Sequence, residues 1–105
     1  MAKLTKVGSV DEFDTCSVKR IEVDGLAIAV VRIDDDFFAV GDRCSHQDVS
    51  LSEGELFCED REIECYKHGS TFSLTDGSPQ SLPATKPVPT FEVSVAEGHV
   101  WIAVP

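Results

Sequence analysis

The stretch that decides the architecture of this chain is residues 44–70, CSHQDVSLSEGELFCEDREIECYKHGS, because it holds two short clusters of cysteine and histidine. Cys44 and His46 form a Cys-x-His cluster, and Cys65 and His68 form a Cys-x-x-His cluster, with 18 residues between His46 and Cys65. Each cluster offers one thiolate and one imidazole. Two such loops, brought together, would form a four-ligand metal site of two sulfurs and two nitrogens.

Two kinds of metal centre suit this ligand set. Structural zinc is often held by two cysteines and two histidines, but zinc sites usually pair Cys with Cys and His with His. A mixed pair on each loop is the pattern of Rieske [2Fe-2S] clusters, in which two histidines replace two cysteines on one iron. The spacing therefore favours an iron–sulfur cluster, and a structural zinc interaction module remains the alternative.

Short strand-like runs surround the two clusters. Alternating apolar and polar residues predict a half-buried strand at 91–95. A second strand is predicted at 18–23, where residues 21–23 show the same alternation. The continuous apolar run 26–31 predicts a strand buried on both faces. Similar runs predict strands at 37–40 and 100–104. Turn signals separate the runs at Asp24-Gly25, Asp34-Asp35-Asp36, Asp76-Gly77 and Glu97-Gly98.

Helical signals are weak in comparison. Capping-box patterns at 9–12 and 50–53 predict single helical turns without a following apolar stripe. Residues 78–89 hold four of the five prolines, so this segment is expected to be a stiff loop. The whole pattern predicts one all-β domain over residues 1–105, a small antiparallel sandwich or barrel.

The charge balance narrows the classes of partner. Nineteen Asp and Glu against nine Lys and Arg give a net charge of −10. This charge argues against nucleic acid and anionic membranes, because both repel a polyanion, and it is compatible with docking onto a basic protein surface.

The distribution of apolar residues and cysteines bears on the cellular compartment in which the protein is expected. No run approaches the roughly 20 apolar residues that span a bilayer, and the first residues lack the apolar segment of a secretory signal. We therefore expect a cytoplasmic protein whose four cysteines form no disulfide framework. Cys16 and Cys58, outside the clusters, are interpreted as small buried thiols.

Several motifs together give the chain a family resemblance that covers nearly its whole length. It resembles the Rieske-type ferredoxins, in particular the ferredoxin subunits of bacterial aromatic-ring dioxygenase systems. The motifs are Cys44-Ser45-His46, residues 49–54, Cys65-Tyr66-Lys67-His68-Gly69-Ser70 with Phe72, and Leu82-Pro83-Ala84-Thr85. The resemblance implies a Rieske domain with cluster-binding loops at about 43–51 and 64–72 and a proline loop at about 78–89.

The resemblance also implies a ligand set. Cys44 and Cys65 would hold one iron of a single [2Fe-2S] cluster, and His46 and His68 would hold the other. A cluster that is neutral when oxidised accepts an electron more easily than an all-cysteine cluster, which raises its reduction potential.

Four further residues are implied to surround the cluster. Gly69 would let backbone amides approach a bridging sulfide, and Ser70 would donate a hydroxyl hydrogen bond to it. Phe72 stands where high-potential members carry a tyrosine. Pro83, with Ala84 beside it, would pack over the cluster.

The chain departs from the high-potential members in a second respect. Val49 and Lys67 stand where those members carry an additional pair of disulfide-forming cysteines. Together with Phe72, this departure predicts a reduction potential nearer about −150 mV than +300 mV.

What the chain lacks indicates its role. Beyond the clusters only His99 remains, so a mononuclear iron site of an oxygenase cannot be built, and no G-x-G-x-x-G dinucleotide motif is present. The expected function is a soluble one-electron carrier rather than an enzyme. It would pass electrons from a flavin-dependent NAD(P)H reductase to a terminal oxygenase, as a monomer that docks transiently.

Two alternative functions remain for a chain of this family. The chain could serve iron–sulfur cluster assembly, or it could be similar to the small subunit of nitrite reductase.

An acidic segment between the two Cys and His clusters is either a solvated face or a docking patch. Its members are Glu53, Glu55, Glu59, Asp60, Glu62 and Glu64.

Overall fold

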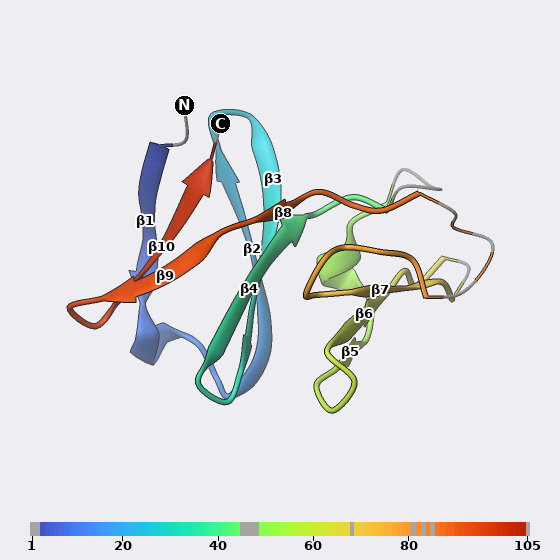
Figure 1. Cartoon of the computed structure of the whole chain (residues 1–105), viewed down its shortest axis with the longest axis horizontal. Helices are drawn as coiled ribbons and strands as arrows, with labels where there is room; N and C mark the ends of the chain where they lie inside the picture. The colour runs from blue at the N-terminus through green and yellow to red at the C-terminus, as the bar shows by residue number, and fades with distance from the viewer. Residues whose placement is uncertain are drawn as a thin grey trace.

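The structure is a computed structural model, and it describes residues 3–44, 49–67, 69–80, 82, 84 and 86–104. Strands in this part of the chain form three antiparallel sheets (Figure 1). The terminal sheet has the order β1 (Lys3–Ser9), β10 (His99–Val104), β9 (Val93–Ala96). The central sheet has the order β2 (Cys16–Val23), β3 (Leu26–Ile33), β4 (Asp36–Gly41), β8 (Thr90–Phe91). The loop-bearing sheet has the order β5 (Leu56–Phe57), β6 (Glu62–Glu64), β7 (Thr71–Ser73).

Helical structure is confined to two single 3-10 turns among the described residues. They are η1 (Val10–Glu12) and η2 (Leu51–Glu53), at the two positions where capping-box patterns predicted single turns. In η1 the backbone N–H of Ser9 donates to Glu12 Oε2 at 2.7 Å, which closes half of the capping box. No helix in this part of the chain has the length and apolar character needed to cross a membrane.

The central sheet is covered on both faces, which explains the unbroken apolar run in β3. Ala29 and Val31 face a core shared with the loop-bearing sheet. Ile28 and Val30 face a second core, shared with the terminal sheet through residues such as Ile102. A strand that alternates between two cores needs an apolar side chain at every position. The predicted all-β sandwich is therefore confirmed.

Tight turns join the strands where the sequence predicted them. Asp24 and Gly25 have φ of 51° and 84°, and Val23 pairs with Leu26 across the β2–β3 hairpin. Positive φ at both central residues is the geometry of the two-residue turns that match strand twist. Glu97 and Gly98 close the β9–β10 hairpin in the same way, with φ of 55° and 76°.

The strand predicted at 91–95 differs from the observed structure. It is divided at Glu92, because Phe91 pairs with Ala39 of the central sheet whereas Val93 pairs with Ile102 of the terminal sheet. The chain crosses from one sheet to the other at this point, and the alternating pattern continues through the crossing. Sequence reasoning also missed β1 and the short strands of the loop-bearing sheet.

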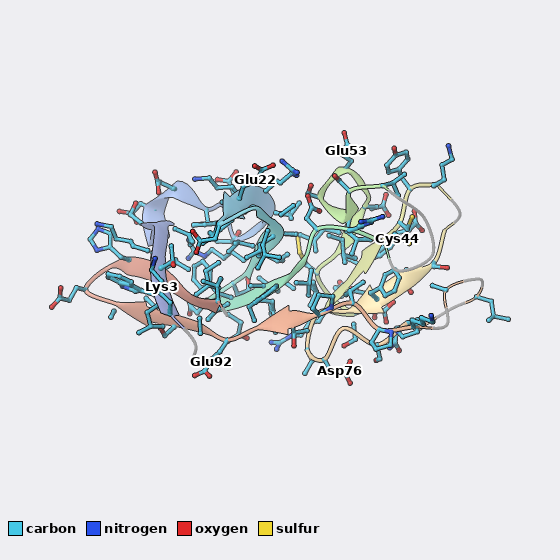
Figure 2. The ribbon with its side chains drawn as sticks, turned by 90° about the horizontal axis from the view of Figure 1, so that it is seen from above. Lys3, Glu22, Cys44, Glu53, Asp76 and Glu92 are labelled. Carbon is cyan, nitrogen blue, oxygen red and sulfur yellow. A yellow bond between two sulfur atoms is a disulfide. The ribbon has the colours of Figure 1, made fainter. Side chains whose placement is uncertain are left out.

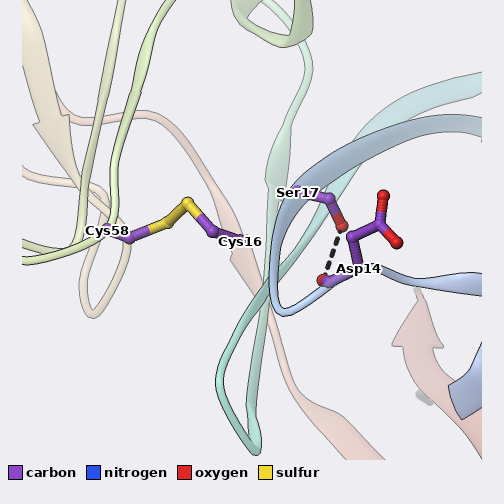
Figure 3. Close-up of a disulfide and its surroundings, with 4 residues drawn as sticks. All are labelled: Asp14, Cys16, Ser17 and Cys58. Carbon is purple, nitrogen blue, oxygen red and sulfur yellow. Dashed lines mark hydrogen bonds between the residues drawn. A yellow bond between two sulfur atoms is a disulfide. The ribbon is translucent and has the colours of Figure 1, made fainter.

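The interpretation of Cys16 and Cys58 as buried thiols was wrong, as was the expectation of no disulfide. The two residues form a disulfide with their Cα atoms 6.2 Å apart, although 42 positions separate them in sequence (Figure 3). Cys16 is exposed and Cys58 is partly buried. The start of β2 and the β5–β6 turn meet only in the folded chain, so no local pattern could show this pairing.

Candidate metal centre

The first cluster loop begins where β4 ends. The backbone N–H of Gly41 donates to the carbonyl of Pro89 at 2.8 Å, and that of Cys44 donates to the carbonyl of Val49 at 3.0 Å. The second bond brings the two ends of the segment around the predicted ligand His46 together. Cys44 is buried, whereas His46 lies outside the described residues.

A buried carboxylate anchors this loop. Asp42 Oδ1 accepts the backbone N–H of Ser52 at 2.6 Å, and its Oδ2 accepts the Ser52 hydroxyl at 2.7 Å. Arg20 Nε of β2 lies 2.9 Å from Oδ2, and the Asp42 side chain is 0% exposed. A buried charge is tolerated only with such partners, so this network fixes the end of β4 relative to η2 and β2. Sequence reasoning missed Asp42, because an aspartate in a loop carries no signal of burial.

Glycine lets the segment after η2 approach the second cluster loop closely. A Cβ atom placed on Gly54 would overlap the carbonyl oxygen of Glu64, the residue before Cys65. Nearby, the backbone N–H of Glu64 donates to the carbonyl of Glu55 at 2.9 Å. The φ of Gly54 is −87°, so close approach rather than backbone conformation requires glycine here.

The second cluster loop is closed by two hydrogen bonds across its ends. The N–H of Cys65 donates to the carbonyl of Ser70 at 2.8 Å, and the N–H of Gly69 donates to the carbonyl of Cys65 at 2.9 Å. Gly69 has φ of +79°, in the left-handed region that favours glycine. Cys65 is fully buried, and His68, between these bonds, lies outside the described residues.

Ser70 also attaches the proline loop to the second cluster loop. Its side-chain Oγ accepts the backbone N–H of Ala84 at 3.1 Å, and both residues are buried. The proline loop therefore lies against the loop of Cys65, although Pro83 itself is outside the described residues.

Phe72, the last of the residues expected around the cluster, is fully buried. It pairs with Ile63 in β6 and forms an isolated bridge with Pro79 at the start of the proline loop. An aromatic side chain at this position fills the core between the loop-bearing and central sheets.

Two of the four predicted ligands lie in the same buried core. Cys44 and Cys65 belong to the same buried cluster, together with Leu51, Ile63 and Phe72. Figure 2 shows Cys44 at the end of the molecule opposite Lys3. Buried thiols on two closed loops suit a thiolate-liganded metal such as the iron of an iron–sulfur cluster.

The acidic segment has its first residue, Glu53, in the same half of the molecule as Cys44, away from Lys3 (Figure 2). Its members lie on η2, on the strands β5 and β6 or on the segments that join them. The exposed members are Glu53, Glu55, Glu59 and Asp60. The partly buried members are Glu62 and Glu64.

Comparison with known proteins identifies the class. Residues 3–92 match the family model of the Rieske [2Fe-2S] domain, so the chain belongs to this family. Its cofactor is therefore one Rieske-type [2Fe-2S] cluster, which decides against the zinc alternative.

Individual relatives are named as a ferredoxin or as the ferredoxin subunit of a dioxygenase. Ferredoxin CarAc of Metapseudomonas resinovorans is 40% identical over 99 residues, covering 93% of this chain and 91% of the relative. The 3-phenylpropionate/cinnamic acid dioxygenase ferredoxin subunit of Photorhabdus laumondii is 39% identical over 98 residues, with the same coverage of 93% and 91%.

Solved structures agree with these sequence matches. The ferredoxin of carbazole 1,9a-dioxygenase from Nocardioides aromaticivorans IC177 superposes with a TM-score of 0.95 at 30% identity, over 98% of this chain and 99% of that chain. A chain from the complex of reduced oxygenase and oxidised ferredoxin in carbazole 1,9a-dioxygenase has a TM-score of 0.89 at 40% identity, over 95% and 92%.

Proposed function

We propose that this chain is the ferredoxin component of an aromatic-ring dioxygenase system and carries electrons to its terminal oxygenase. The observation that carries the proposal is the pair of closed loops that bury Cys44 and Cys65 in one cluster of residues. The names of the relatives support the same role, since they are ferredoxins or ferredoxin subunits of such systems.

Cys44, His46, Cys65 and His68 are the proposed cluster ligands. A bound Rieske cluster takes up and releases one electron at a time. The chain's own contribution is to hold the ligands on loops fixed by Asp42, Gly54 and Ser70. Burial of both thiols favours retention of the metal, because water and competing ligands reach them poorly.

Electrons would come from a flavin-dependent NAD(P)H reductase and leave to the oxygenase. The single carrier must then meet two partners in turn, which favours a monomer with small, short-lived interfaces. A solved complex between an oxygenase and a ferredoxin of carbazole dioxygenase supports docking with the second partner.

The acidic residues beside the cluster loops would guide this docking. Glu53 and Glu55 are exposed and flank Gly54, next to the second cluster loop. A concentrated negative surface attracts a basic partner surface over about 10 Å at moderate ionic strength. The electrostatic contribution would act mainly on the association rate rather than on the affinity.

Stopped-flow mixing of the reduced protein with a terminal oxygenase of the carbazole-dioxygenase type tests this function. We expect second-order electron transfer that slows as salt is raised. The double variant Glu53→Gln/Glu55→Gln should slow it further, whereas the matched variant Glu92→Gln/Glu97→Gln, on exposed residues of the terminal-sheet region, should not. Absence of electron transfer to any such oxygenase would contradict the function. Equal effects of the two double variants would contradict the proposed docking surface but not the electron-carrier function.

A further inference from the structure

The Cys16–Cys58 disulfide joins two sheets that share one core. Cys16 is the first residue of β2 in the central sheet, and Cys58 follows β5 in the loop-bearing sheet. Figure 3 shows the bridge between these two segments. It has no part in the proposed metal centre, whose thiols are Cys44 and Cys65.

Interactions other than the bridge hold its two ends together. Arg61, in the same turn as Cys58, has its Nη2 2.7 Å from Asp36 Oδ2, and its guanidinium lies 5.4 Å from the ring centre of Phe38. Asp36 pairs with Ile33, and Ile33 also pairs with Cys16. The β5–β6 turn is thus fastened beside the start of β2 independently of the sulfurs.

These contacts keep the two cysteines close together after the disulfide has been reduced. If the disulfide is reduced, the Arg61–Asp36 pair and the shared core still hold both cysteines near the observed Cα separation of 6.2 Å. That separation lies within the range for disulfides. Two thiols held at bridging distance rejoin in an intramolecular reaction, which has a high effective concentration.

Exposure separates this pair from the other cysteines of the chain. Cys16 is exposed, whereas Cys44 and Cys65 are buried. Access is one of the factors that set the rate of thiol–disulfide exchange. An external thiol therefore reaches Cys16 more readily than it reaches Cys44 or Cys65.

We propose that Cys16 and Cys58 form a second redox site, which exchanges two electrons and two protons with dithiols and small disulfides. A thiolate of the dithiol attacks Cys16 Sγ, the S–S bond breaks, and Cys58 Sγ leaves as a thiolate that takes up a proton. The second thiol of the dithiol then attacks the mixed disulfide, which releases Cys16 as a thiol and the reagent as a disulfide. Glutathione disulfide reverses the process and is reduced to two glutathione molecules.

The test uses the full-length protein without denaturant and without oxygen. The protein is first reduced with dithiothreitol, transferred into buffers with graded ratios of glutathione to glutathione disulfide, quenched with acid and alkylated. Peptide mass spectrometry then locates the alkylated cysteines. We expect one transition in which Cys16 and Cys58 gain or lose alkyl groups together. The ultraviolet circular dichroism of the fold should stay the same on both sides of the transition.

Three variants sharpen the result. Cys16→Ser should abolish the paired transition and leave Cys58 as a mixed disulfide with glutathione. Arg61→Gln should lower the ratio of bridged to open protein about two- to fivefold at a fixed glutathione ratio, the range that one exposed ion pair supports. Lys3→Gln removes an exposed positive charge on the terminal sheet and should leave that ratio unchanged.

Two outcomes would overturn the proposal. One is a bridge that dithiothreitol opens only after denaturation, which would make it a purely structural disulfide. The other is a pair that stays reduced at every glutathione ratio. Neither depends on iron, so a failure here is distinguishable from a failure of the electron-carrier function, which iron content and electron transfer report.

Discussion

Asp42 receives two hydrogen bonds from Ser52, one from the backbone N–H at 2.6 Å and one from the hydroxyl at 2.7 Å. This contact ties the residue that precedes the first cluster loop to the short helix η2 that follows it. Arg20 of β2 completes the arrangement, with its Nε 2.9 Å from Oδ2 of the same carboxylate. The segment that carries Cys44 and His46 is therefore held at both of its ends.

Replacing this carboxylate should loosen the first loop. Asp42→Ala leaves the partly buried Ser52 donors without their partner and removes the buried partner of Arg20, so we expect a loss of about 3 kcal/mol in the free energy of unfolding. Urea unfolding monitored by circular dichroism measures this loss. Glu22→Gln is the matched control, because Glu22 makes the exposed second ion pair of Arg20 at 3.0 Å. Equal stability of the two variants would contradict the anchoring role of Asp42.

Close packing at Gly54 predicts a second effect on stability. In Gly54→Ala the new methyl group overlaps the carbonyl of Glu64, so we expect a loss of about 1–3 kcal/mol together with a shift of the second cluster loop. Gly25→Ala provides the comparison, because Gly25 has open space around it but φ of +84°, which costs about 1–2 kcal/mol for alanine. Both changes should appear in unfolding, but only Gly54→Ala should alter iron retention.

Ser70 is expected to influence both the proline loop and the reduction potential. Ser70→Ala removes the acceptor of the Ala84 N–H and the hydroxyl donor proposed for a bridging sulfide, and loss of a donor to the cluster lowers its potential. Redox titration should therefore show a more negative midpoint than in the unchanged protein. Faster hydrogen exchange at the amide of Ala84 would report the loosened loop. Ser73→Ala is the control. It removes a hydroxyl at the end of β7, three residues after Ser70, that accepts the backbone N–H of Thr75 at 3.2 Å, and it should leave the midpoint unchanged.

The reduction potential of the unchanged protein is itself a prediction. Phe72 is buried and has no hydroxyl to donate, and Val49 and Lys67 cannot form a disulfide. We expect a midpoint nearer about −150 mV than +300 mV. A spectroscopic titration with mediators measures it, and a midpoint well above zero would show that these substitutions do not lower the potential.

Part of this fold could be predicted from the sequence because it depends on patterns within a few neighbouring residues. The apolar run of β3 indicates burial on both faces, and Asp24-Gly25 and Glu97-Gly98 are hairpin turns by their residue types alone. The Cys and His clusters were recognisable for the same reason, since each lies within a few residues.

The rest depends on contacts between distant segments. The crossing at Glu92, the burial of Asp42 and the meeting of Cys16 with Cys58 follow from how three sheets pack, and no sequence pattern records them. The disulfide was missed for a further reason. The expected compartment bears on whether thiols are oxidised, but it does not bear on whether two cysteines lie within reach of one another.

The most direct test of the central claim is metal analysis combined with electron paramagnetic resonance of protein purified without oxygen and reduced with dithionite. Ligation by Cys44, His46, Cys65 and His68 predicts two irons and two sulfides per chain and a rhombic signal of the Rieske type. Replacing Cys65 with serine should abolish that signal. One zinc per chain, with no sulfide and no signal, would contradict the claim.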